Sequence, residues 1–159
     1  MKTEYPPIGT VSHGTMRDED LIPEFAYILE KYAPERYESL RAEYASLFEE
    51  MDAEDFEDFE DYESASYLTG ALFEEMDAIA PPYYYFGASE GDGSDYGFWP
   101  SIGSLEEDAR YKEGVIKVSD TSEVPSNWRD YVMFVSDHGN VTLYETTDSG
   151  NLEEIWSVV

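Results

Sequence analysis

Apolar side chains recur at alternating intervals of three and four residues in the first half of the chain. This spacing places them on one face of a helix. Three such stretches end near Tyr32, Met51 and Ala80, and prolines follow the first and the third. Proline ends a helix because it lacks the amide hydrogen and clashes with the preceding turn. The pattern therefore predicts three helices, the second over residues 35–51 and the third over residues 64–80.

The second half of the chain changes to a pattern that is typical of strands. Aromatic runs at 83–86 and 96–99 flank a stretch of Gly, Ser and acidic residues, which predicts a hairpin with a wide loop. A short helix is expected over residues 105–111. Four later segments are rich in β-branched and aromatic residues, which favour strands. These segments are 115–119, 131–136, 141–146 and 152–159.

Short turn sequences separate the last three of these strands. Asp-His-Gly-Asn at 137–140 and Asp-Ser-Gly-Asn at 148–151 favour tight turns, and so predict an antiparallel meander. Helices first and strands later indicate an α+β fold, with N-terminal helices packed on a C-terminal antiparallel sheet of hairpin plus meander. The length favours a single domain over residues 1–159, mainly helical to residue 82 and mainly β over residues 83–159.

The charge balance is strongly acidic. The chain has 37 Asp and Glu against 9 Lys and Arg, a formal net charge of -28. Hydrophobic residues make up 42% of it and aromatic residues 16%, which is more than disordered polyanions carry and indicates a folded core. Attraction to phosphate depends on Lys and Arg, so direct binding of nucleic acid or of an anionic membrane is excluded as a general surface property. Residues 18–82 are the most acidic part, with 21 acids and 3 bases.

Familiar catalytic patterns are missing from the sequence. There is no cysteine, and the two histidines, His13 and His138, do not form a metal-binding spacing. No nucleophile elbow, phosphate-binding loop or dinucleotide fingerprint occurs. We therefore expect no enzyme, no cofactor and no metal site. The N-terminal residues lack an apolar signal region, and no stretch reaches the roughly 18 apolar residues of a membrane span, so the expected location is the cytoplasm.

The sharpest candidate is the acidic run at residues 49–63, which has ten acids and no base. In helical form its aromatic residues would line one side, while aspartates three residues apart would line another. Such rows would resemble the two phosphate rows of a nucleic-acid duplex, which carry one charge per roughly 1.7 Å of axis. Two tyrosines of the aromatic hairpin complete the predicted partner-binding set. The set is Glu49, Glu50, Asp52, Glu54, Asp55, Phe56, Glu57, Asp58, Phe59, Glu60, Asp61, Tyr62, Glu63, Tyr84 and Tyr96.

Three other interpretations of these features stay open. A charge run is most often a solvated loop between two helices. Aromatic residues on hairpin strands are most often core on one face, although tyrosines also anchor protein interfaces. Adaptation to high salt would explain an acidic surface without any partner, but it would spread the acids over the whole chain instead of concentrating them in one run.

Three sequence blocks carry a resemblance to known proteins. They are His-Gly-Thr-Met-Arg at 13–17 with Asp-Leu-Ile-Pro at 20–23, Tyr-Tyr-Phe-Gly-Ala at 84–88 with the following 91–99, and Asp-His-Gly-Asn-Val-Thr-Leu-Tyr at 137–144. These blocks resemble a group of small acidic bacterial proteins found on mobile elements, a group that implies no particular activity. The order of the elements is similar to that of SUKH immunity proteins, which bind toxins. The acidic run is similar in composition to phage antirestriction and anti-CRISPR proteins that imitate DNA.

The sequence therefore favours a non-enzymatic acidic inhibitor that imitates DNA. Its expected partner is a basic nucleic-acid-binding protein, either a nuclease or a CRISPR- or restriction-type effector. Three alternatives remain: an immunity protein of the SUKH type that neutralises a toxin, a housekeeping domain adapted to salt, and a hydrolase that works with paired carboxylates.

Overall fold

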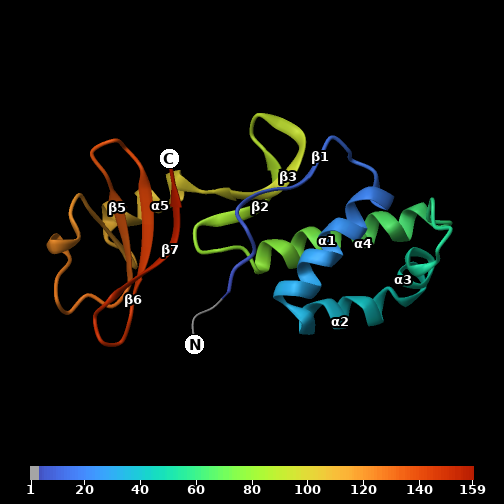
Figure 1. Cartoon of the computed structure of the whole chain (residues 1–159), viewed down its shortest axis with the longest axis horizontal. Coiled ribbons are helices and arrows are strands. Elements are labelled where there is room, and N and C mark those ends of the chain that lie inside the picture. Colours follow the sequence, from blue (N-terminus) through green and yellow to red (C-terminus); the bar gives the residue numbers. More distant parts are fainter. Residues whose placement is uncertain (1–3) are drawn as a thin grey trace. The chain divides into compact units, whose positions relative to one another are not determined.

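The computed structural model describes residues 4–159, and it has the α+β fold that the sequence predicts (Figure 1). The helices are α1 Asp18–Tyr32, α2 Pro34–Glu43, α3 Ala45–Asp52, α4 Tyr62–Ala78 and α5 Ile102–Tyr111, with a 3-10 turn at Thr121–Glu123. The strands are β1 Gly9–His13, β2 Tyr84–Ser89, β3 Asp92–Pro100, β4 Val115–Val118, β5 Tyr131–Val135, β6 Val141–Thr146 and β7 Leu152–Val158. No helix within residues 4–159 combines the length and apolarity needed to cross a membrane.

The chain divides into two compact units. Unit 1 comprises the residues up to Ala80 together with 84–99, and unit 2 comprises 81–83 together with 100–159. The aromatic hairpin of β2 and β3 thus belongs with the helices of unit 1, not with the later strands. This grouping differs from the expected division after residue 82, because the hairpin buries its aromatic face against the N-terminal helices.

Unit 1 packs helices α1 and α4 with a three-stranded antiparallel sheet of order β1-β3-β2. Its interior is rich in aromatic rings. Phe25 of α1 is fully buried and meets Phe73 of α4 and Phe86 of β2 edge-on, with ring centroids 5.1 and 4.9 Å apart. Edge-to-face pairs of this kind add to the stability gained from the buried area. Leu29 of α1 and Leu68, Leu72 and Met76 of α4 are also fully buried, so these two helices turn apolar residues of their predicted stripes into the core.

Strand β1 is the element that sequence patterning missed. It pairs antiparallel with β3, and Thr10 lies opposite Gly97. A Cβ atom on Gly97 would lie 2.1 Å from the carbonyl oxygen of Gly9, so only glycine permits this close approach of the two strands. The strand is short and has no alternating pattern, and its partner strand lies more than 80 residues later in the chain. The local sequence therefore carries no signal that predicts it.

Unit 2 contains a four-stranded mixed sheet of order β4-β5-β6-β7. Strands β5, β6 and β7 form the predicted antiparallel meander, with Met133 opposite Leu143 and Leu143 opposite Trp156. Strand β4 pairs with β5 in the parallel direction, which the expectation of an antiparallel sheet did not include. A parallel pair needs a crossover connection, and residues 119–130 supply it with a 3-10 turn.

Two further expectations are corrected by the backbone. The predicted helix 35–51 is two helices, because Tyr44 leaves helical geometry with φ -113 and ψ 38. After this break, Phe48 of α3 packs edge-on against Tyr37 of α2, with ring centroids 5.8 Å apart. The hairpin loop is not wide: β2 ends at Ser89 and β3 begins at Asp92, so only two residues connect them.

Candidate partner-binding surface

The acidic run 49–63 is not a helix through its middle. Helix α3 ends at Asp52, helix α4 begins at Tyr62, and residues 53–61 between them have no regular secondary structure. The predicted helical rows of aspartates and aromatics are therefore wrong. Acids three or four residues apart on one helix repel each other, which disfavours a helix through this run.

Phe59 anchors this segment in unit 1. Its side chain is 1% exposed, and the half-buried Phe56 lies against it with ring centroids 4.8 Å apart. Glu50 on α3 adds a second attachment, because its Oε1 accepts a hydrogen bond of 3.0 Å from the Glu60 amide. The sequence assigned both phenylalanines to partner contact. The structure instead gives Phe59 an interior role.

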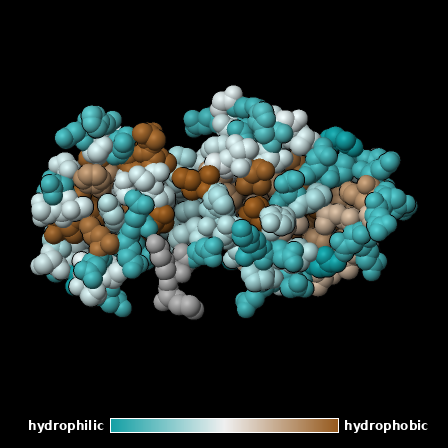
Figure 2. Space-filling model, viewed as in Figure 1, coloured by the Kyte–Doolittle hydropathy of each residue, from teal (hydrophilic) through white to brown (hydrophobic). Residues whose placement is uncertain are grey.

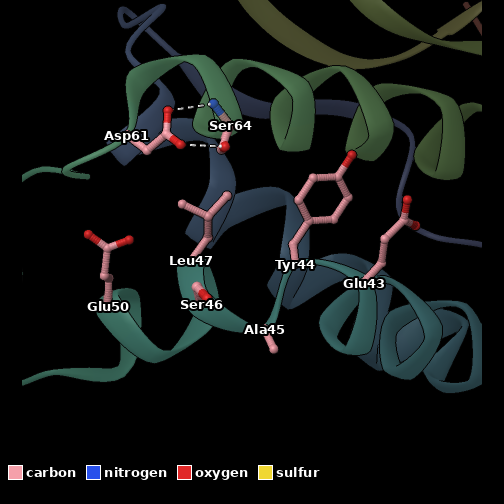
Figure 3. Close-up of a pocket in the computed structure, with 8 residues that line it drawn as sticks. All are labelled: Glu43, Tyr44, Ala45, Ser46, Leu47, Glu50, Asp61 and Ser64. Atoms are coloured by element: carbon pink, nitrogen blue, oxygen red, sulfur yellow. Dashed lines mark hydrogen bonds between the residues drawn. The ribbon is translucent and has the colours of Figure 1, made fainter.

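Asp61 connects the segment to helix α4. Its carboxylate accepts hydrogen bonds from the Ser64 hydroxyl, at 2.7 Å, and from the Ser64 amide, at 3.1 Å (Figure 3). This is an N-cap, which satisfies one of the amides that a helix leaves unpaired in its first turn. The two hydrogen bonds, with that from the hydroxyl the larger contribution, lower the pKa of Asp61. Asp61 thus has an internal role, although it was predicted as a partner-facing aspartate.

Two arginines hold other aspartates of the run. Arg17, at the N-terminus of α1, forms an ion pair of 3.1 Å with Asp58 and one of 2.7 Å with Glu19. Arg41 of α2 pairs with Asp52 at the end of α3 and also donates a hydrogen bond of 2.8 Å to the Tyr37 hydroxyl. These bonds raise the pKa of Arg41, with Asp52 the main cause. Sequence reasoning missed both arginines, although bases are so few in this half of the chain that each was certain to have an acid near it.

The remaining acids of the run point their charge to solvent. Within residues 4–159, no hydrogen bond or ion pair engages the side chains of five exposed acids of the run. These are Glu49, Glu54, Asp55, Glu57 and Glu60. Tyr62 is also exposed, with 64% of its surface accessible, and Glu63 is exposed beside Tyr67, whose hydroxyl lies 3.5 Å from it. We call residues 49–63 the acidic segment.

A shallow hollow lies beside the acidic segment. It is lined by residues around the break between α2 and α3 and by the start of α4. Leu47 and Tyr44 point from the α2–α3 side toward α4, while Glu50 and Glu43 lie on either side of them (Figure 3). Hydrophilic residues predominate over much of the helical part of unit 1 in the space-filling view (Figure 2). The acidic segment therefore lies beside a surface that combines carboxylates with some apolar area.

The two hairpin tyrosines of the predicted set are not at the surface. Tyr84 and Tyr96 are each 8% exposed. Tyr96 packs on the rings of Phe25 and Phe73 in the interior of unit 1. Burial raises the pKa of Tyr84 to about 12. The core interpretation of the hairpin aromatics holds for this pair, and neither ring belongs to a surface that a partner would meet.

His13 and the hairpin turn connect two of the blocks that the sequence singled out. The His13 Nε2 atom lies 3.0 Å from Asp92 Oδ2, and Asp92 also accepts hydrogen bonds of 2.9 Å from the amide and the hydroxyl of Ser94. These bonds, led by the Ser94 amide, lower the pKa of Asp92. No group of His, Asp or Glu in the described part of the chain has the arrangement needed to hold a metal ion.

Comparisons with family models, with curated proteins and with solved structures found no match for this chain.

Proposed function

We propose that this protein is a non-enzymatic cytoplasmic inhibitor that uses its acidic segment to occupy the basic nucleic-acid groove of another protein. The partner class is a nuclease or a CRISPR- or restriction-type effector. One observation carries the proposal. Five acidic side chains of the acidic segment stay exposed and unpaired, namely Glu49, Glu54, Asp55, Glu57 and Glu60, while Phe59, Glu50 and Asp61 attach the segment to the fold.

The negative charge of unit 1 supports the first step of such binding, which is the attraction of a basic groove. Unit 1 holds 25 of the 37 acids and only 5 of the 9 bases. A field of one sign steers an oppositely charged groove toward it and raises association rates by roughly 10–1,000-fold. The range of this attraction is about 8 Å in physiological salt, so it acts mainly in the last stage of approach. The inhibitor would therefore bind quickly and with strong salt dependence.

The attachment of the acidic segment to the fold supports the second step, which is the formation of a stable complex. A segment that is ordered before binding loses less conformational entropy on binding than a mobile tail of the same composition. Carboxylates held in place can accept the paired hydrogen bonds of arginine, as phosphates do. The exposed ring of Tyr62 offers apolar contact next to these charges, and tyrosine is a frequent anchor at interfaces. Charge would set the association rate, and Tyr62 would extend the lifetime of the complex.

The test neutralises acids that have no structural role. The variant E54Q/D55N/E57Q/E60Q removes four charges from the acidic segment, whereas changing Asp52, Asp58 or Asp61 would also break internal contacts. The matched control removes four exposed acids of unit 2, as D137N/E145Q/E153Q/E154Q. Both variants have the same net charge, so a difference between them reports position and not total charge.

Inhibition is measured as cleavage of a linear DNA duplex by a Cas9–guide RNA complex, a type I restriction enzyme and a bacterial DNase toxin. We expect the parent to inhibit at least one of them, the segment variant to be at least about tenfold weaker and the control to stay within about twofold. Equal inhibition by the segment variant and the parent would refute the role of the segment. If the parent inhibits none of the three, it is used to capture partners from a bacterial lysate, and the absence of a nucleic-acid-binding protein among them would refute the function.

A further inference from the structure

The acidic segment is held at two points, Asp52 and Asp58, by arginines of the same chain. Arg17 reaches Asp58 across 41 positions of sequence, and Arg41 reaches Asp52 across 11 positions. We infer that Arg17 and Arg41 are positioning residues, which hold the acidic segment in the shape that its partner recognises. This inference rests on the proposed function, and it adds how the binding surface is kept ordered.

Arg17 is itself fixed before it reaches the segment. Its Nε and Nη2 atoms lie 2.8 and 2.7 Å from Glu19 Oε1, and the Glu19 side chain is only 11% exposed. Asp20 lies 4.0 Å away on the same turn of α1. The same Nη2 atom also donates to Asp58 Oδ1 at 3.1 Å, so the contact with Glu19 orients the guanidinium toward the acidic segment. Hydrogen bonding to Glu19 is the main cause of the raised pKa of Arg17.

Arg41 is held from two further sides. Its Nη1 atom donates to the Tyr37 hydroxyl at 2.8 Å, and its guanidinium carbon lies 5.3 Å from the centre of the Phe48 ring. A guanidinium over an aromatic face and within reach of a hydroxyl has a defined orientation, which a lysine ammonium would not reproduce. Arg41 therefore fixes the end of α3, where the acidic segment leaves the helix.

The backbone alone does not supply this order. Residues 53–61 form no helix or strand, and the contacts that fix them come largely from side chains. Exposed ion pairs contribute little to global stability. They are nevertheless sufficient to bias the shape of a short connection, because opening it requires no unfolding of the core.

Positioning and charge predict opposite effects of removing the arginines. The variant R17Q/R41Q loses two positive charges, so the formal net charge changes from -28 to -30. If attraction to a basic groove depended on charge alone, this variant would bind more tightly than the parent. If the arginines position the segment, it would bind more weakly in spite of the added negative charge. The sign of the change therefore decides between the two.

The experiment compares R17Q/R41Q with a control of equal charge in unit 2, R110Q/K112Q, and with R17K/R41K. One readout is hydrogen exchange at two hydrogen-bonded amides of the region, Phe56 and Glu60. The other is inhibition of the enzyme that the parent inhibits, or displacement of a labelled DNA duplex from the captured partner. If the double glutamine variant does not fold, the single variants R17Q and R41Q replace it.

We expect both amides to exchange about fivefold faster in R17Q/R41Q and inhibition to fall about fivefold, since each exposed pair contributes up to about a factor of five. The lysine variant should lie between that variant and the parent, and the control should match the parent. Inhibition equal to or stronger than that of the parent would overturn the inference, and so would weaker inhibition without a change in exchange. Failure of the parent itself to inhibit or displace would overturn the proposed function instead, and the exchange rates would still report on positioning.

Discussion

The acidic segment of unit 1 and the two tight turns of unit 2 both connect regular elements, but they are held in different ways. Backbone bonds close the turns, since the Ser136 amide donates to the Asn140 carbonyl at 2.9 Å and the Thr147 amide donates to the Asn151 carbonyl at 2.8 Å. The hydroxyls of Ser136 and Thr147 accept further bonds from the amides of Asn140 and Asn151 within the same turns. The acidic segment is held mainly by the side chains of Phe59, Asp61 and two arginines. A connection held by side chains can carry an unusual shape and charge, but its order then depends on those few residues.

The largest effect is expected at the buried anchor. Phe59→Ala removes a side chain that is 1% exposed, and it should lower the free energy of unfolding by about 3–5 kcal/mol. Urea denaturation followed by fluorescence measures this change. Phe56→Ala is the matched control in the same segment, and because Phe56 is only half-buried it should cost clearly less. Equal losses in the free energy of unfolding for the two variants would mean that Phe59 is not the main anchor of the acidic segment.

The turns should depend on backbone conformation instead. Gly139 has φ +83, and a Cβ there would meet no atom within 4 Å, so the only penalty of Gly139→Ala is the left-handed backbone. That penalty is about 1–2 kcal/mol. Gly70→Ala in helix α4 is the control of opposite sign, because alanine favours a helix and the site has free space. Thermal denaturation should show a lower midpoint for the first variant and a higher one for the second. A Gly139→Ala variant with the same thermal midpoint as the parent would show that the turn does not depend on a left-handed backbone at this position.

The cap at Asp61 should make the stability of α4 depend on pH. Because the folded-state pKa of Asp61 is lowered, its contribution is present above the unfolded value, about 3.9, and is lost as the pH falls through the folded value. Asp61→Asn keeps an N-cap without the titrating group. The variant should therefore match the parent near neutral pH and lose less stability on acidification. Urea midpoints at pH 7 and pH 3 check this, and parallel losses in the two proteins would contradict it.

The smallest effect concerns salt. At 1 M NaCl the screening length falls to about 3 Å, so the exposed ion pairs of Arg17 and Arg41 weaken, whereas backbone bonds do not. Hydrogen exchange at the Phe56 amide should become a few times faster in high salt, and exchange at the Gly139 and Gly150 amides should not change beyond the solvent effect. Equal responses of the segment and the turns would show that ion pairs do not distinguish them.

The sequence predicted the regular elements well where its signals were local. Helical periodicity located α1 and α4, and the Gly-containing turns located the β5–β7 meander. The signals failed where distant contacts decide the outcome. Strand β1 depends on pairing with β3, and the direction of β4 depends on its crossover.

The sequence located the acidic run but did not predict its conformation. The composition of residues 49–63 identified the most acidic run, and the structure leaves acids of that run exposed. The spacing of three could not reveal that Phe59 turns into the core, because hydrophobic periodicity does not distinguish a helix face from a loop with one buried residue. Arg17 and Arg41 could not be assigned to Asp58 and Asp52 without knowledge of the fold.

We propose that the acidic segment and a polynucleotide compete for the same groove of the partner, and a displacement measurement decides whether they do. A fluorescently labelled DNA duplex is bound to the partner, and its anisotropy is followed as the parent protein or the E54Q/D55N/E57Q/E60Q variant is added. We expect the parent protein to displace the duplex completely and the variant to need at least about tenfold higher concentration to do so. A ternary complex, in which the partner holds the duplex and the parent protein together, would contradict it.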